Sequence, residues 1–187
     1  MKIAVCVKQT FDTEAKIVLK NGKVSDDGIN LIINPYDEVA VEEALQIKEK
    51  QGGEVLVVSA GSDKAQDAIR QALAMGADKG VLINSDTEAD EFARAGILAK
   101  AISGLGAELI LCGHVAADDG SSQVPTRLAE ILNLPHVNVV RKLELNGNTA
   151  VCTRETDGGT EIIEVKLPAI ITCQVGMNEP RYPSMKG

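Results

Sequence analysis

Short apolar runs that alternate with amphipathic segments restrict the fold of this sequence more than any other feature. The apolar runs lack the polar alternation of half-exposed strands, which is typical of strands buried on both faces. The segments between them carry apolar residues at helical spacing. Because parallel strands are joined by long crossovers, this pattern predicts an α/β fold with a parallel, twisted sheet and helices on both faces. We expect strands at residues 3–7, 54–60, 80–84 and 109–113, and helices at residues 36–50, 64–75, 88–103 and 121–132.

The pattern changes after residue 137, where expected strands follow one another without helices. Asn146-Gly147 and the Asp-Gly-Gly of residues 157–159 are typical hairpin turns. They predict a C-terminal antiparallel β meander appended to the α/β core. Its strands are expected at residues 139–145, 149–155, 160–167 and 170–175.

The remaining segments suggest a single domain over residues 1–187, since no linker, repeat or low-complexity stretch divides them. Asn21-Gly22 predicts a further small hairpin after the apolar residues 17–19. Residues 178–187 are polar and without periodicity, so they predict a loop that can need a partner to become ordered.

The composition supports a packed core and argues against several classes of partner. Hydrophobic residues make up 44% of the chain, aromatic residues only 2%, and the net charge is −8. Few aromatic rings and a negative charge disfavour nucleic acid as a partner. The sequence shows no apolar run that could insert into a membrane and no secretory signal. We therefore expect a cytoplasmic protein.

The four cysteines have no metal-ligand spacing. Cys6, Cys112 and Cys173 lie in expected buried strands, which favours reduced, core-filling thiols.

The most informative candidate site follows the strand that ends at Gly113. In open α/β sheets, ligands bind beyond the carboxyl ends of the strands, near the point where strand order reverses. Residues 7–9, 59–61 and 113–124 occupy such positions. In the last segment, Ser121 or Ser122 opens a helix, and the hydroxyls of Ser121 and Ser122 and the amide of Gln123 could donate to a phosphate. Asp118 and Asp119 could accept hydrogen bonds from ribose hydroxyls. Simple helix capping by Asp119 or Ser121 explains the same residues about as well.

Common nucleotide motifs and catalytic sets are missing. The chain has no GxGxxG after its first strand and no GxxxxGK[ST], so NAD binding of the Rossmann type and a P-loop are not expected. His114 and His136 have no Ser or Cys nucleophile arranged with them in the sequence, and no catalytic triad can be argued.

A set of short motifs runs through the chain from Met1 to about residue 185. The motifs are Val5-Cys6-Val7-Lys8-Gln9, the Ile-Asn-Pro-Tyr-Asp-Glu of residues 33–38 with Ala-Val-Glu-Glu-Ala at 40–44, Val58-Ser59-Ala60-Gly61, the Ala-Leu-Ala-Met-Gly-Ala-Asp of 72–78, Leu111-Cys112-Gly113 with the loop ending Ser122-Gln123-Val124, Arg-Glu-Thr-Asp-Gly-Gly at 154–159, Val-Lys-Leu-Pro-Ala at 165–169, and Asn-Glu-Pro-Arg-Tyr at 178–182. Each motif alone is weak, but the ordered set is specific. In this order, the motifs resemble those of the beta subunits of electron-transfer flavoproteins.

The resemblance implies an adenine-nucleotide-binding sandwich that works as an electron carrier, without catalytic side chains of its own. In this family, the beta subunit pairs with an alpha subunit that carries the redox FAD. The beta subunit buries AMP, or a second FAD in bifurcating members. The pair accepts electrons from acyl-CoA dehydrogenase-type flavoenzymes, in the cytoplasm or, in eukaryotes, in the mitochondrial matrix. The choice between AMP and FAD, and between simple transfer and bifurcation, stays open.

The resemblance also implies which residues contact the nucleotide. Cys6 and Ala60 would act through their backbone, and Asn34 would orient a polar group. Tyr36 matches an aromatic position near the flavin of the alpha subunit, although local packing at a helix start explains it too. The implied nucleotide contacts are Cys6, Asn34, Pro35, Tyr36, Asp37, Ala60, Gly113, His114, Val115, Ala116, Ala117, Asp118, Asp119, Gly120, Ser121, Ser122, Gln123 and Val124.

Near the C-terminus, the family's dehydrogenase-docking loop follows Tyr182, and Met185 occupies its anchoring apolar position. Family members continue for several dozen residues beyond this point into an arm that wraps the alpha subunit. The C-terminal arm is missing from residues 1–187, which indicates either a fragment of such a protein or a member that lacks this arm.

Two other functions fit the fold class less well. A stand-alone, universal-stress-like nucleotide-binding module predicts a Gly-rich phosphate loop late in the chain, which is missing. An ATP-dependent enzyme on this fold needs a motif such as SGGxDS after the first strand, and residues 7–12 do not supply it.

Overall fold

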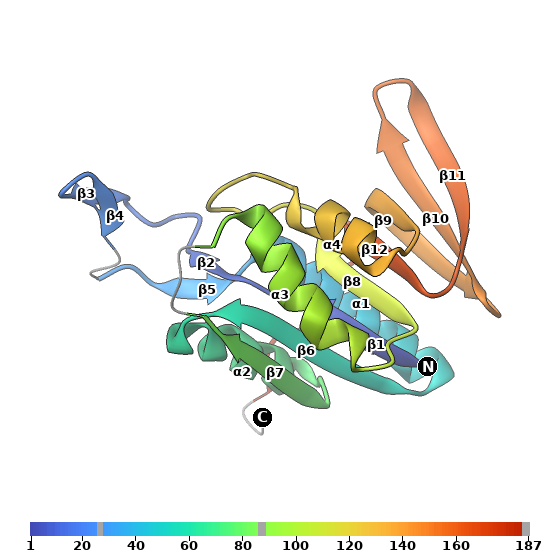
Figure 1. Ribbon diagram of the computed structural model, residues 1–187. Coiled ribbons are helices and arrows are strands. Elements are labelled where there is room, and N and C mark those ends of the chain that lie inside the picture. The colour runs from blue at the N-terminus through green and yellow to red at the C-terminus, as the bar shows by residue number, and fades with distance from the viewer. Residues whose placement is uncertain (26–27, 86–88, 185–187) are drawn as a thin grey trace.

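A central eight-stranded sheet organises the chain. The computed structural model describes residues 1–25, 28–85 and 89–184. The strand order in the sheet is β11-β10-β9-β12-β8-β1-β6-β7. The α/β fold with a C-terminal antiparallel part is confirmed, and Figure 1 shows the sheet running through the molecule.

The parallel part of the sheet has the winding expected of a nucleotide-binding fold. The chain runs from β1 to β6 and β7 on one side, then returns to β8 and β12 on the other side. Strand order therefore reverses between β1 and β8, where a crevice is expected. The strands are β1 (Lys2–Cys6), β6 (Glu54–Gly61), β7 (Lys79–Asn84), β8 (Leu109–Gly113) and β12 (Ala169–Cys173).

Helices cover both faces of this sheet. Alternate residues of β1 point to opposite faces: Ile3 and Val5 pack with α1 and α2, whereas Ala4 and Cys6 pack with α3 and α4. In Figure 1, α3 and α4 lie in front of the sheet and α1 and α2 behind it. The helices are α1 (Pro35–Gln51), α2 (Gln66–Met75) after the short 3₁₀ turn η1 (Asp63–Ala65), α3 (Glu91–Ser103) and α4 (Val124–Leu132).

The helix starts depart from the expected ones for local reasons. In α3, the Asp90 side chain caps the helix by accepting from the Ala93 amide at 2.8 Å, so the helix begins at Glu91. The expected start at residue 88 lies outside the described residues. In α4, the helix begins at Val124 and not at Ser121, because Ser122 has a left-handed φ of 54° that a helix cannot contain.

The last strand was expected as the fourth strand of the meander, and this prediction was wrong. β12 runs parallel to both β8 and β9 and lies between them. All five of its residues are buried, which is the pattern of an interior parallel strand. Only three strands form the antiparallel meander: β9 (His136–Asn146), β10 (Thr149–Thr156) and β11 (Gly159–Lys166).

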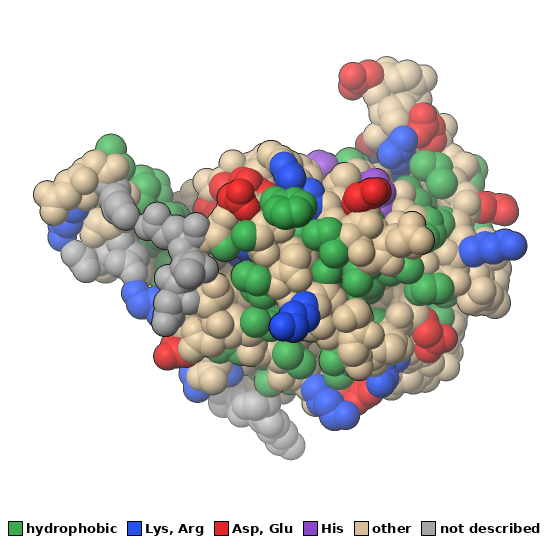
Figure 2. Space-filling view, in the orientation of Figure 1, with side chains coloured by type: hydrophobic (Ala, Val, Ile, Leu, Met, Phe, Trp, Pro, Cys, Tyr) green, Lys and Arg blue, Asp and Glu red, His purple; other side chains and the backbone are tan. Residues whose placement is uncertain are grey.

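Four short strands extend the link between β1 and α1. β2 (Gln9–Phe11) pairs with β5 (Leu31–Ile33), and β3 (Val18–Lys20) pairs with β4 (Lys23–Ser25) in a hairpin. Asn21 and Gly22 turn this hairpin with φ angles of 52° and 76°, as the Asn-Gly pair predicts. The hairpin projects from the body and exposes apolar side chains, which Figure 2 shows in green: Ile17, Val18, Leu19 and Val24.

The four cysteines are buried and unpaired, as expected of core thiols. Among the described residues, no helix is both long and apolar enough to cross a membrane.

Candidate functional site

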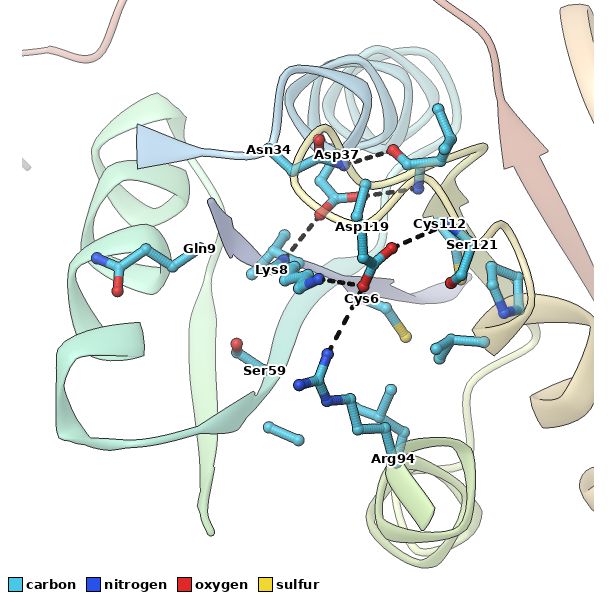
Figure 3. Close-up of a pocket in the computed structure, with 18 of the residues that line it drawn as sticks. Cys6, Lys8, Gln9, Asn34, Asp37, Ser59, Arg94, Cys112, Asp119 and Ser121 are labelled. Carbon is cyan, nitrogen blue, oxygen red and sulfur yellow. Dashed lines mark hydrogen bonds and ion pairs between the residues drawn. The ribbon is translucent and has the colours of Figure 1, made fainter. Parts of the chain in front are cut away.

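A cavity of about 310 Å³ opens at the carboxyl ends of β1, β6 and β8, where the strand order reverses. Its walls come from the end of β1, the start of α1, the end of β6, α3, and the segment from β8 to α4, and Figure 3 shows residues from them. Its floor includes the apolar residues Cys6, Leu98, Cys112 and Leu128. Polar residues of the loop between β8 and α4 form one side. An apolar floor with a few convergent polar groups is typical of a small-molecule site.

Asp37, in the first turn of α1, ties the two central strands together below the cavity. Its Oδ2 accepts from the Lys8 amide at 2.7 Å, and its Oδ1 accepts from the Gly113 amide at 2.9 Å. Burial raises the pKa of the Asp37 carboxyl to about 7, although these amides and Lys8 favour the charged form. The carboxyl group therefore shapes the crevice between β1 and β8.

Asn34, the residue before α1, holds the loop that follows β8. Its Nδ2 donates to the Val115 carbonyl at 2.9 Å, and its Oδ1 accepts from the Ala117 amide at 3.1 Å. The side chain is buried, and both of its polar ends are bonded within the chain. Asn34 thus braces the loop, and it has little capacity left to orient a ligand.

Lys8 joins the end of β1 to the acidic part of this loop. Its Nζ lies 2.7 Å from Asp118 Oδ1 and 2.7 Å from Asp119 Oδ2. Asp119 Oδ1 also accepts from the Ser121 amide at 3.0 Å. Burial opposes ionisation of Asp119, but the hydrogen bonds from Lys8 and Ser121 outweigh it and lower its pKa. Asp119 is therefore favoured in its ionised form, and Lys8 holds both carboxyl groups at the mouth of the cavity.

The backbone just before α4 has the geometry of an anion-binding nest. Ser122 is left-handed with φ 54°, and Gln123 is right-handed with φ −99° and ψ −31°. Alternating hands of this kind turn successive amides toward one concave side. The amides of Ser122, Gln123 and Val124 make no hydrogen bond to any residue in the described ranges. Ser122, Gln123 and Val124 stand at the positive end of the α4 dipole, and all three residues line the cavity.

The side chains of Ser122 and Gln123 were expected to donate to a phosphate, but both make hydrogen bonds within the chain. The Ser122 hydroxyl donates to the His114 carbonyl at 2.6 Å, so its amide rather than its hydroxyl is the free donor. The Gln123 side-chain oxygen accepts from Arg127 Nη2 at 2.6 Å, which leaves the NH₂ group of Gln123 to donate. Burial lowers the pKa of His114, so its ring is neutral at pH 7.

The structure brings most of the sequence-predicted residues to the cavity wall. Those that line it are Cys6, Asn34, Asp37, Ala60, Gly113, His114, Val115, Ala116, Asp118, Asp119, Ser121, Ser122, Gln123 and Val124. Four predicted residues are not part of the wall: Pro35, Tyr36, Ala117 and Gly120. Pro35 and Tyr36 form the first turn of α1, and Tyr36 packs beside Gly113. Tyr182 is 95% exposed and far from the site in sequence, and Met185 lies outside the described residues.

Some wall residues were missed or only partly anticipated. Lys8 and Gln9 follow β1, so the strand-end rule indicates them, although the resemblance does not imply a nucleotide contact for either. Arg94 and Leu98 enter the wall from α3. Their spacing of four residues puts Arg94 on the same helix face as the buried Leu98. This spacing is the sequence feature that could have indicated Arg94 as a wall residue.

Comparisons with known proteins agree on one family. Residues 21–187 match the family model described as the electron transfer flavoprotein domain. Over the whole chain, the sequence is 69% identical to an electron transfer flavoprotein subunit beta of Syntrophomonas wolfei, of which it covers 75%. It is 47% identical to the subunit beta of Bacillus subtilis, covering 74% of that protein. It is 38% identical to the caffeyl-CoA reductase-Etf complex subunit CarD of Acetobacterium woodii, covering 73%.

Proposed function

The chain belongs to the electron transfer flavoprotein family as a beta-subunit type, and from this premise we propose that its cavity holds an adenine nucleotide, either AMP or the AMP half of FAD. The single observation that carries the proposal is that Ser122, Gln123 and Val124 line the cavity at the start of α4, while their backbone amides make no hydrogen bond within the described residues. Such a nest is suited to a phosphate group. We infer that residues 1–187 act as one nucleotide-binding domain.

The rest of the cavity suits the other parts of an adenine nucleotide. The base would lie over the apolar floor formed by Cys6, Cys112 and Leu98, with backbone groups of Cys6 and Ala60 at its edge. The Asp118 and Asp119 carboxylates, which pair with Lys8, have further lone pairs that can accept from ribose hydroxyls.

The proposed role of the subunit is to hold the nucleotide in a fixed position for electron transfer. A flavin supplies the electron transfer when it is bound, either on the alpha subunit or in this cavity. Because the rate of electron transfer falls steeply with distance, the useful property of this chain is rigidity around the nucleotide. Asp37 and Asn34 supply it by fixing the ends of β1 and β8 and the loop that follows.

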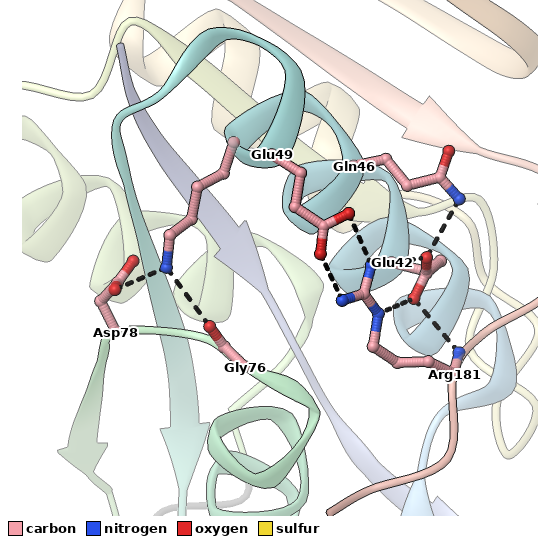
Figure 4. A network of polar contacts seen from close by, with 7 residues as sticks. Glu42, Gln46, Glu49, Gly76, Asp78 and Arg181 are labelled. Atoms are coloured by element: carbon pink, nitrogen blue, oxygen red, sulfur yellow. Dashed lines mark hydrogen bonds and ion pairs between the residues drawn. The ribbon is translucent and has the colours of Figure 1, made fainter.

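The proposed partners are an alpha subunit and an acyl-CoA dehydrogenase-type flavoenzyme. Figure 4 shows how the tail that leads to the expected docking loop is held on α1: Arg181 Nε bonds Glu42 Oε2 at 2.8 Å and Arg181 Nη1 bonds Glu49 Oε1 at 2.6 Å. Tyr182 follows directly and is exposed. A fixed stem with an exposed aromatic residue is a suitable start for a docking loop.

The function is tested by producing the chain together with an electron transfer flavoprotein alpha subunit and extracting the purified protein. Mass spectrometry of the extract should find AMP or FAD, and visible absorption should separate the two. An extract without adenine nucleotide contradicts the proposal. If nucleotide is found but the chain does not associate with the alpha subunit, the stand-alone module is the better description.

A further inference from the structure

Arg94 carries a positive charge into the cavity from the wall opposite β1. It lies in the first turn of α3, and Figure 3 shows its side chain directed from that helix toward Asp119. Its Nη1 is 3.9 Å from Asp119 Oδ2, which is an ion pair without a hydrogen bond. Within the described part of the chain, the guanidinium group makes no hydrogen bond. Among the described residues, a group with five donors is thus left largely unused beside a cavity.

Lys8, the other strongly basic side chain of the described cavity wall, is bound differently. Its Nζ makes two ion pairs at 2.7 Å, to Asp118 and Asp119, and is largely satisfied by them. Within residues 1–25, 28–85 and 89–184, Arg94 is held by one longer contact, to a carboxylate that already has Lys8 as a partner. Arg94 can therefore turn to an incoming anion at a smaller cost than Lys8.

The position of Arg94 places it near the anion nest. The first turns of α3 and α4 lie side by side, since the Arg127 guanidinium carbon stands 6.0 Å from the centre of the Phe92 ring. Asp119, the contact of Arg94, bonds the Ser121 amide through its other oxygen at 3.0 Å. Ser121 directly precedes the three free amides. The guanidinium and the nest thus approach the same region from two helices.

A phosphate at the nest needs more positive charge than the amides supply. The nearby Asp118 and Asp119 repel a phosphate dianion, and Lys8 is already shared between them. An arginine offers two parallel donors that match two phosphate oxygens, and it stays charged at all relevant pH values.

We propose that Arg94 is a phosphate-binding residue of this cavity, turning from Asp119 to grip the nucleotide phosphate from the side opposite the amides of α4. The inference rests on the proposed function and assigns the site a contact that specifically recognises the anionic end of its ligand. Leu98, one turn further along α3, stays in contact with the apolar part of the cavity.

The test uses equilibrium dialysis of the full chain against AMP and, separately, against adenosine, with bound ligand measured by mass spectrometry. The variants are Arg94→Gln and Arg94→Lys. The matched control is Lys100→Gln, which removes the same charge from the exposed C-terminal end of the same helix. Thermal melting by circular dichroism checks that each variant is folded.

Arg94→Gln is expected to weaken AMP binding by about tenfold or more, while adenosine binding changes by less than about twofold. Arg94→Lys should restore part of the AMP affinity, and Lys100→Gln should resemble the wild type. Equal losses for AMP and adenosine, or no loss for AMP, overturn the assignment of Arg94. If the wild type binds neither ligand, the proposed function itself fails, and the inference fails with it.

Discussion

The Asp37 carboxylate accepts the backbone amide of Gly113 at 2.9 Å, although the two residues belong to different elements far apart in the chain. The other oxygen of the same carboxylate accepts the Lys8 amide at 2.7 Å. One side chain at the start of α1 therefore spans the ends of β1 and β8, on either side of the reversal of strand order. The cavity opens directly above this link, so its shape depends on a single buried acid.

Gly113→Ala is expected to destabilise the protein by about 1–3 kcal/mol. A Cβ at this position would overlap the Asp37 carboxylate and come within 2.8 Å of the Tyr36 backbone, so the first turn of α1 must shift. Urea denaturation measures the effect. The control is Gly96→Ala within α3, where a Cβ meets nothing within 4 Å and should raise stability by about 0.5–1 kcal/mol. Similar stability for both variants would contradict the close contact at Gly113.

The buried carboxyl of Asp37 predicts a particular pH dependence of stability. The unfolded chain releases this proton near pH 3.8, whereas burial keeps it on the folded protein until about pH 7. Between these values the folded state binds more protons, so this group makes the free energy of unfolding fall as pH rises. Asp37→Asn removes the titration and places an amide NH₂ against a backbone N–H, at a cost of about 1–3 kcal/mol.

The stability difference between the wild type and Asp37→Asn should therefore shrink from pH 4 to pH 7 and become constant above that range. Denaturant titrations at several pH values measure this difference. The contributions of the other acidic residues are the same in both proteins, so they cancel. A difference that grows with pH would mean that the two amides already hold Asp37 ionised.

Ser122→Asp is expected to reduce nucleotide retention about tenfold or more, because it adds a negative charge at the nest. Asp and Asn both tolerate the left-handed φ of 54° at this position, so Ser122→Asn is the matched control. The Asn side chain can also replace the Ser122 hydroxyl as a donor to the His114 carbonyl. The nucleotide that remains after gel filtration gives the result. Equal retention in the two variants would argue against a phosphate at this turn.

Arg181→Gln should release the tail from α1 and lower the free energy of unfolding by about 1–3 kcal/mol. Burial opposes ionisation of Glu42, but the hydrogen bonds from Arg181 lower its pKa, and the variant leaves this carboxylate without its cation. Hydrogen exchange of residues 174–184 should become faster. The control Arg70→Gln removes an exposed ion pair on α2 and should change stability by less than about 0.5 kcal/mol. Unchanged exchange in Arg181→Gln would show that the tail is held by other contacts.

The sequence predicts local structure well where one pattern dominates. Buried runs and helical spacing locate the four early strands and four helices, and Asn21-Gly22 locates the hairpin between β3 and β4. The place of β12 was missed, because hydrophobic patterns do not report which strands become neighbours. The apolar run of β12, which is fully buried in the structure, indicated an interior strand. The hairpin turns that precede it nevertheless favoured its assignment to the meander.

The candidate site was predicted in part for similar reasons. The strand-end rule selects the loop after β8, because the ends of parallel strands meet at one edge of the sheet. It cannot select Arg94, whose side chain reaches the cavity only through the packing of α3 beside α4. It also could not show that Ser122 has a left-handed φ and so delays the start of the helix, because a left-handed serine has no clear sequence signature.

A crystal structure of the chain with AMP would show directly whether the start of α4 binds a phosphate. Phosphate oxygens are expected within hydrogen-bond distance of the backbone amides of Ser122, Gln123 and Val124, with the base over Cys6 and Leu98. A nucleotide whose phosphate lies elsewhere, with these three amides facing only solvent, would contradict the proposed phosphate site.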